Sequence, residues 1–113
     1  EFVYLSPSRL ATLDQAERKQ EIKAYWLRND PYYCDADDAE SFEAFLQRVS
    51  FFYQQILKHD GYVIVVSHGQ FLKAFQLGLT HGFSVSKRWM SFFREQEILA
   101  PIKNGEIVRL YFE

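Results

Sequence analysis

The residues most able to do chemistry in this sequence are Ser67-His68-Gly69, which directly follow the apolar run Val63–Val66. A glycine lets the backbone approach a ligand closely, and a helix predicted to begin near Gln70 points its free N–H groups to the same place. These groups and the helix dipole favour an anion, and a histidine on the same turn can donate a charge-assisted hydrogen bond to it. The pattern predicts a phosphate or carboxylate site at His68, Gly69 and Gln70. The alternative is that His68 packs at the end of a strand and binds no ligand.

Other kinds of active site find less support in the sequence. A serine-hydrolase elbow requires Gly-x-Ser-x-Gly, and Val65 stands where its first glycine would be. Asp35, Asp37 and Asp38 lack the glycine and the distal glutamate of a calcium loop, so we interpret them as capping and solvated residues. The single cysteine, Cys34, can form no internal disulfide, and no Cys/His pair has zinc spacing. We therefore expect neither a metal nor another cofactor.

Helices and strands are expected to alternate around His68. Apolar spacing predicts helices over residues 13–28, 38–59 and 70–79, and another from a cap at Ser84 to about residue 95. The run Tyr62–Ser67 has no polar alternation, which is typical of a parallel strand buried on both faces. Two further strands are predicted over 97–102 and 106–112, joined by Asn104-Gly105, a hairpin signal. The other predicted helix caps are Thr12 and Asp37.

These elements predict an α/β fold, a three-layer sandwich with a mostly parallel sheet and flanking helices. A parallel strand buried on both faces needs a neighbour on each edge, and few candidate strands precede Tyr62. The predicted sheet is therefore incomplete at the N-terminus. With 113 residues, we expect a single domain over residues 1–113.

Composition and charge narrow the class of protein. Apolar residues make up 48% of the chain and charged residues 25%, which is ordinary for a globular protein. A net charge of −2 argues against a nucleic-acid partner. The longest apolar run, Val63–Val66, is too short to cross a bilayer, so no membrane partner is expected. A lone cysteine suits a reducing cytoplasm, which is the localisation we predict.

Several motifs together resemble the C-terminal half of the histidine phosphatase superfamily, which is phosphoglycerate-mutase-like. They are Glu40-Ser41-Phe42 and Arg48-Val49 on one predicted helix, the run Val65-Val66-Ser67-His68-Gly69, and a late Asn-Gly turn before a last strand, Ile107 to Phe112. Their order and rough spacing are similar to the family from about Asp30 to the end of the chain. The resemblance implies phosphomonoester hydrolysis or phosphoryl transfer by way of a phosphohistidine.

The resemblance also implies roles for particular residues. In the family, a histidine of an Arg-His-Gly motif attacks phosphorus, while a second histidine, which His68 matches, and two arginines hold the phosphoryl oxygens. A carboxylic acid protonates the leaving oxygen and then activates water. This sequence contains no Arg-His-Gly, and it begins at Glu1 without an initiator methionine. We therefore expect the C-terminal portion of a longer enzyme or a relic without catalysis, and no turnover by the 113 residues alone.

The N-terminal end of the resemblance has two registers. The first, which we prefer, places Glu1 on the family's general acid, so that the catalytic residues implied are His68 and Glu1. The second places Ser6–Thr12 on the family's Ser-x-x-x-Arg-Ala phosphate arginine, although Arg9 follows Ser6 by three positions and the motif needs four. A terminal residue without a role is the alternative for Glu1.

The partner implied by these assignments is a small phosphorylated substrate or inorganic phosphate. A strand without a neighbour would also expose a sheet edge, through which copies of the chain could associate. The alternative function is a non-catalytic phosphate-binding or protein-interaction module of the same fold that lacks the nucleophile. Such a module would bind a protein through its aromatic surface, since aromatic residues make up 18% of the chain.

Overall fold

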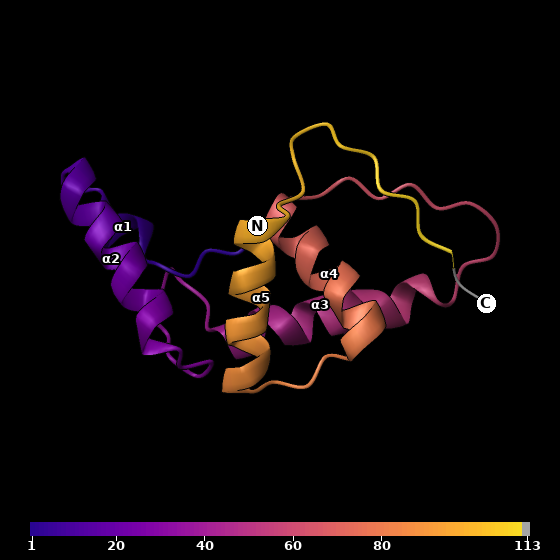
Figure 1. Cartoon of the computed structure of the whole chain (residues 1–113), viewed down its shortest axis with the longest axis horizontal. Helices are drawn as coiled ribbons and strands as arrows, with labels where there is room; N and C mark the ends of the chain where they lie inside the picture. The colour runs from indigo at the N-terminus through magenta and orange to yellow at the C-terminus, as the bar shows by residue number, and fades with distance from the viewer. Residues whose placement is uncertain (112–113) are drawn as a thin grey trace.

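The structure, a computed structural model, describes residues 1–111, and 53% of them are helical. Five helices follow one another along this part of the chain: α1 (Pro7–Leu10), α2 (Gln15–Arg28), α3 (Phe42–Ile56), α4 (Gly69–His81) and α5 (Lys87–Leu99). α1 and α2 lie at one end, α3, α4 and α5 lie together in the middle, and two segments without helix extend beyond them (Figure 1). Within residues 1–111 there is no β-strand.

The predicted α/β sandwich with a mostly parallel sheet is therefore wrong for the described residues. The run Tyr62–Ser67, predicted to be buried on both faces, is exposed: the side chains of Tyr62, Ile64 and Val66 are 105%, 90% and 92% accessible. A strand can satisfy its backbone only by hydrogen bonding to a neighbouring strand, and no part of residues 1–111 pairs with this run. Without a sheet there is no sheet edge in this region, so self-association stays an untested prediction.

The predicted C-terminal hairpin is also wrong, although its turn forms. The backbone N–H of Glu106 donates to the carbonyl of Lys103 at 3.0 Å, and Gly105 adopts the left-handed φ of 77° that such a turn favours. The segments on either side of the turn do not pair, and the first of them begins inside the last turn of α5. Phe112, the predicted end of the last strand, lies outside the described residues.

The four predicted helices are present, but the three N-terminal caps that the sequence predicts are wrong. Asp14 begins α2 through a reciprocal capping box, in which its carboxylate accepts from Glu17 N at 2.8 Å. Thr12 lies two residues before this cap, and its hydroxyl donates to the carbonyl of Arg9 at 2.8 Å. Ser41 and Ser86, not Asp37 and Ser84, cap the N-termini of α3 and α5.

A short additional helix, α1, replaces the chain break that the sequence suggests around Ser6-Pro7-Ser8. The Ser6 hydroxyl accepts from Arg9 N at 3.2 Å, and Pro7 occupies the first helical position, where a missing N–H costs nothing. The proline therefore starts a helix here.

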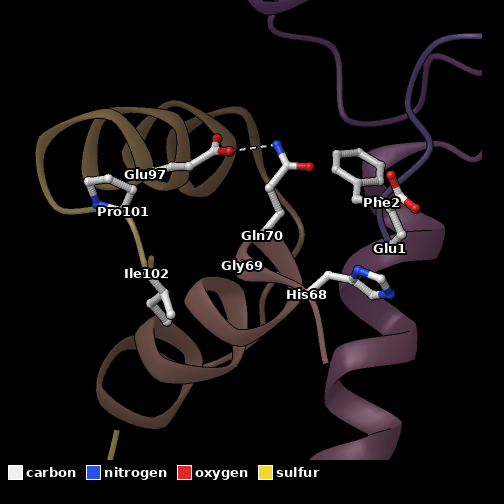
Figure 2. Close-up of a pocket in the computed structure, with 8 residues that line it drawn as sticks. All are labelled: Glu1, Phe2, His68, Gly69, Gln70, Glu97, Pro101 and Ile102. Carbon is white, nitrogen blue, oxygen red and sulfur yellow. Dashed lines mark hydrogen bonds between the residues drawn. The ribbon is translucent and has the colours of Figure 1, made fainter. Parts of the chain in front are cut away.

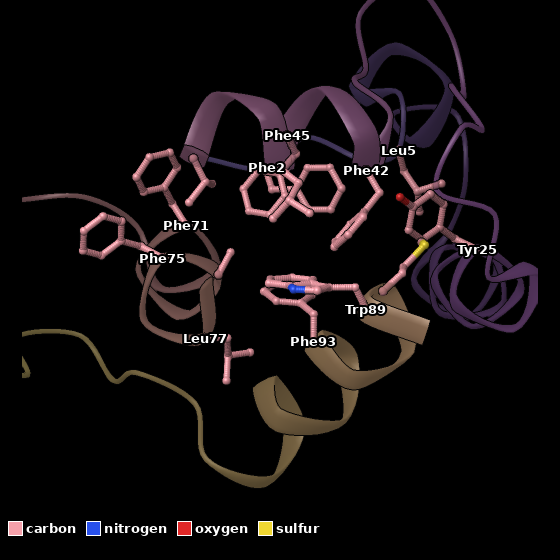
Figure 3. Packing of buried hydrophobic residues seen from close by; sticks show 14 residues of the cluster. Phe2, Leu5, Tyr25, Phe42, Phe45, Phe71, Phe75, Leu77, Trp89 and Phe93 are labelled. Atoms are coloured by element: carbon pink, nitrogen blue, oxygen red, sulfur yellow. The ribbon is translucent and has the colours of Figure 1, made fainter. Parts of the chain in front are cut away.

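An aromatic core joins α3, α4, α5 and the N-terminal segment (Figure 3). Phe42, Phe45, Leu46 and Val49 of α3 are fully buried, as the helical spacing of apolar residues predicts. Phe2 stacks on Phe45 with ring centroids 4.1 Å apart and an interplanar angle of 14°. This stacking holds the first residues of the chain against α3, close to the start of α4.

Candidate functional site

A cavity of about 280 Å³ lies where α4 begins (Figure 2). It brings together Glu1, His68, Gly69 and Gln70, the four residues predicted from the sequence to form a site. Its remaining wall is made by Phe2, Glu97, Pro101 and Ile102. Residues from the two ends of the chain and from the start of α4 therefore share one cavity, which no stretch of sequence could show by itself.

His68 occupies the N-cap position of α4 in an extended conformation, with φ of −105° and ψ of 154°. Its carbonyl accepts from Leu72 N at 2.9 Å, but its side chain makes no capping hydrogen bond. The imidazole is exposed, so it is not packed in hydrocarbon. The first backbone N–H groups of α4, at Gly69 and Gln70, have no partner inside the helix and carry the positive end of its dipole.

Gly69 is needed at this position for a steric reason. A Cβ atom there would lie 3.0 Å from the backbone oxygen of Ile102, which is closer than ordinary side-chain contacts. The segment after α5 therefore passes directly over the start of α4 and closes that side of the cavity. A larger residue at 69 would push this segment away.

The side chain of Gln70 is tied to α5 by a hydrogen bond that the sequence does not predict. Its side-chain Nε2 donates to Glu97 Oε1 at 2.6 Å. Arg94 Nη1 contacts the other carboxylate oxygen of Glu97 at 3.2 Å, and the Arg94 guanidinium lies 4.6 Å from the Trp26 ring centroid. Glu97 and Arg94 are thus part of the cavity wall and its support, although the sequence predicted residue 97 to begin a strand.

Glu1 is placed by the motif Glu40-Ser41-Phe42 together with Arg48. Arg48 Nη2 donates to the backbone carbonyl of Glu1 at 3.0 Å and to Glu40 Oε1 at 2.7 Å. The backbone N–H of Glu40 donates to the carbonyl of Val3 at 2.9 Å, which fixes the same segment a second time. These bonds and the burial of Phe2 orient the first residue toward the cavity.

Arg9, the phosphate arginine of the second register, does not line this cavity. Its guanidinium contacts Glu21 Oε2 at 2.9 Å and Asp35 Oδ1 at 2.8 Å. Hydrogen bonds to Glu21 and Asp35 raise the pKa of Arg9 above its ordinary value. Arg9 therefore joins α1, α2 and the loop before α3.

Asp35 and Asp38, interpreted from the sequence as capping and solvated residues, anchor α1. Burial alone would raise the pKa of Asp35, but hydrogen bonds from Ser6 N, the Tyr33 hydroxyl and Arg9 outweigh it and hold this pKa below the ordinary value. Asp38 accepts from the backbone and hydroxyl of Ser8, and hydrogen bonding by Ser6 and Ser8 lowers its pKa to about 2. Spatial proximity across some thirty residues produces this cluster, which sequence spacing could not indicate.

The other two histidines of the chain lie elsewhere. His59 lines a second cavity of about 340 Å³ between α3 and the extended run Val63–Val66. His81 ends α4, with its ring centroid 4.7 Å from that of Phe92. Within residues 1–111, His68 is the one histidine at the cavity that contains Glu1.

Among residues 1–111, no three His, Cys, Asp or Glu side chains come together as a metal site would require. None of the helices in this range combines the length and the apolar character needed to cross a membrane.

A histidine at the N-terminus of α4 and a glutamate thus line the same cavity. The family model described as histidine phosphatase superfamily (branch 1) matches residues 8–97, which is more than half of the chain and includes His68, Gly69 and Gln70. The chain belongs to this superfamily, as its motifs predicted. Comparisons with curated proteins and with solved structures found no match.

Proposed function

We propose that this chain binds the phosphoryl group of a small phosphomonoester at the start of α4, as part of a site for phosphomonoester hydrolysis or phosphoryl transfer. One observation carries the proposal: in a member of the histidine phosphatase superfamily, Glu1, His68, Gly69 and Gln70 line a single cavity. In this proposal His68 is the second pocket histidine, which holds the phosphoryl oxygens. Glu1 is the general acid.

The chemistry of each group suits its proposed part. The backbone N–H groups of Gly69 and Gln70 and the dipole of α4 stabilise the negative charge of the phosphoryl oxygens. A protonated His68 donates a charge-assisted hydrogen bond to the same oxygens. As the phosphorus–oxygen bond breaks, the carboxylic acid of Glu1 transfers its proton to the leaving alcohol oxygen and becomes a carboxylate, which can then take a proton from attacking water.

The nucleophile is a separate matter, because the 113 residues contain no Arg-His-Gly. In the family's reaction a histidine nitrogen bonds to phosphorus as the alcohol leaves, and water later releases phosphate from that nitrogen. His59 and His81 do not line the cavity with Glu1. We therefore expect the 113-residue chain to bind phosphate and not to turn over a phosphomonoester.

A second candidate function rests on the exposed histidine at the start of α4, which needs no nucleophile to bind phosphate. A chain with a phosphate-binding histidine and no nucleophile motif can serve as a non-catalytic binding module of this superfamily. This module would share the phosphate site with the enzyme and differ from it in lacking turnover under all conditions. Addition of a polypeptide that carries the Arg-His-Gly part of the family distinguishes the two, since it restores turnover only for the enzyme portion.

The test is a titration of the chain with inorganic phosphate, followed by NMR of the histidine ring signals. We expect the His68 signals to shift and those of His59 and His81 to stay in place. His68→Gln should abolish phosphate binding, and His59→Gln, a matched change at an exposed histidine of the second cavity, should leave it intact.

Two results would contradict the proposal. Equal shifts of the His59 and His68 signals would show that phosphate binds to the chain nonspecifically and not at the start of α4. Robust hydrolysis of p-nitrophenyl phosphate by the 113-residue chain, lost in His68→Gln, would contradict the expected lack of turnover.

A further inference from the structure

Gln70 and Glu97 form a polar pair on the wall of the cavity, opposite the side on which Glu1 and His68 lie (Figure 2). Their hydrogen bond, from Gln70 Nε2 to Glu97 Oε1, is short at 2.6 Å. Glu97 is mostly buried, since its side chain is 16% exposed, and its second oxygen contacts Arg94. The pair is therefore held from the side of α5 and does not depend on a ligand for its geometry.

The chemistry of this pair determines which way the amide of Gln70 faces. An ionised carboxylate can only accept hydrogen bonds, and the amide of glutamine has one face that donates and one that accepts. The NH2 group of Gln70 must therefore face Glu97. A reversed amide would place the carbonyl oxygen against the carboxylate and bring two acceptors together.

The carbonyl oxygen of Gln70 is consequently the group offered to the cavity. Figure 2 shows Oε1 pointing away from Glu97, toward Phe2 and the side of the cavity where Glu1 lies. No side chain or backbone group of residues 1–111 donates a hydrogen bond to this oxygen. An accessible acceptor, fixed in orientation and without a donor, is suited to a ligand that supplies one.

We propose that the site prefers phosphomonoesters whose organic group carries a hydrogen-bond donor close to the ester, and that Gln70 selects for this donor. This inference rests on the proposed function, because the phosphoryl group must occupy the start of α4 for the organic group to face Gln70. Glu97 is a positioning residue, since it acts through the amide that it orients. The donor can be a hydroxyl or an ammonium group, and both would bind the same oxygen.

The experiment measures dissociation constants of the 113-residue chain for three esters of equal size, by the NMR titration described above. They are 2-hydroxyethyl phosphate, 2-aminoethyl phosphate and n-propyl phosphate, with inorganic phosphate as the reference. We expect the hydroxyethyl ester to bind about five- to tenfold more tightly than the propyl ester, as one additional hydrogen bond predicts. A larger gain for the aminoethyl ester than for the hydroxyethyl ester identifies the ammonium group as the preferred donor.

Two variants test whether the orientation of Gln70 causes the preference. Glu97→Gln offers both a donor and an acceptor, so it permits the amide of Gln70 to reverse, and the ratio of the hydroxyethyl and propyl constants should fall to about one. Gln70→Leu removes the acceptor oxygen but leaves Glu1 and Glu97 in place. It should also lower the ratio of the hydroxyethyl and propyl constants to about one. Glu95→Gln, which makes the same charge change at an exposed position of α5, should keep the wild-type ratio.

The outcomes separate this inference from the function on which it rests. If inorganic phosphate binds at His68 but the three esters bind equally, the donor preference is overturned and the phosphate site stands. If the preference persists in both Glu97→Gln and Gln70→Leu, Gln70 is not its cause and the inference is overturned. If phosphate does not bind at all, the proposed function fails and the inference fails with it.

Discussion

The helix α3 and the extended run Tyr62–Ser67 are both rich in apolar residues, but the apolar face of α3 is buried and the extended run is exposed to solvent. Phe42, Phe45 and Leu46 of α3 are completely buried, whereas Ile64 and Val66 of the extended run are 90% and 92% exposed. A helix satisfies its own backbone N–H and C=O groups, so it can bury an apolar face against any suitable neighbour. An extended segment must first find another segment for its backbone hydrogen bonds. The comparison teaches that an apolar segment of this chain is buried only where its backbone N–H and C=O groups also have hydrogen-bond partners.

The extended run nevertheless lies beside α3, with which it lines a cavity. Val63 and Val65 are 46% and 37% exposed, whereas Tyr62, Ile64 and Val66 are 105%, 90% and 92% exposed. An alternation with a period of two thus exists in the structure and not in the sequence. The two extended segments also enlarge the molecule, whose radius of gyration of 15.1 Å exceeds the roughly 13 Å of a compact domain of this length.

The largest effect expected from this comparison is a difference between two truncations. Phe45→Ala should lower the free energy of unfolding by about 3–5 kcal/mol, because Phe45 is fully buried and stacks on Phe2. Ile64→Ala should change it by less than about 0.5 kcal/mol, because its side chain is already in solvent. Urea denaturation of the two variants measures both values. A loss above about 1 kcal/mol for Ile64→Ala would show that the extended run is packed, and would remove the distinction between the two regions.

A smaller effect concerns the acid stability of the helical region. The lowered pKa values of Asp35 and Asp38, the latter at about 2 against an ordinary 3.8, mean that both carboxylates stabilise the fold above about pH 4 and lose this contribution as the pH falls toward 2. Asp35→Asn should therefore cost about 2 kcal/mol at pH 7 and make the loss of stability below pH 4 less steep. The urea midpoint, followed from pH 7 to pH 2, checks both expectations.

Asp37→Asn is the matched control for the acid series, because Asp37 is an exposed carboxylate of the same loop. It should leave the midpoint and its pH dependence unchanged. Identical curves for Asp35→Asn and Asp37→Asn would mean that the bonds from Ser6, Tyr33 and Arg9 contribute nothing to stability.

The smallest expected effect concerns a polar atom inside the aromatic core. The hydroxyl of Tyr25 is buried and has no hydrogen-bond partner among residues 1–111, and burial raises the pKa of this phenol above its ordinary value. Tyr25→Phe should stabilise the chain by up to about 1 kcal/mol, because it removes an unsatisfied group. Tyr33→Phe should destabilise it by about 1 kcal/mol, because Tyr33 donates to Asp35 at 2.8 Å. Thermal unfolding of both variants gives the two signs, and a loss for Tyr25→Phe would contradict the first.

The helices and the candidate site were the most predictable features. The apolar stripe from Phe42 to Val49 predicts its own burial, because its period matches one helical face. His68-Gly69 before a helix predicts an open N-terminus, which α4 has. The strands were not predictable in the same way. The apolar run Tyr62–Ser67 indicates that the segment favours burial, but it does not indicate whether another strand is available to pair with it.

Sequence by itself determined the family, the positions of the four longer helices and the turn His68-Gly69-Gln70 at the start of α4, because each depends on neighbours along the chain. Tertiary structure alone decided that Glu1 and His68 line the same cavity, that Arg9 forms an ion pair with Asp35, and that Glu97 orients the amide of Gln70. These contacts join residues that are far apart in sequence. Aromatic packing among α3, α4, α5 and the N-terminal segment brings the cavity residues together, and the ion pair of Arg9 with Asp35 joins α1 to the loop before α3. The spacing of residues along the chain does not predict contacts between distant segments. The residues that form the cavity wall can therefore be identified only from the folded structure.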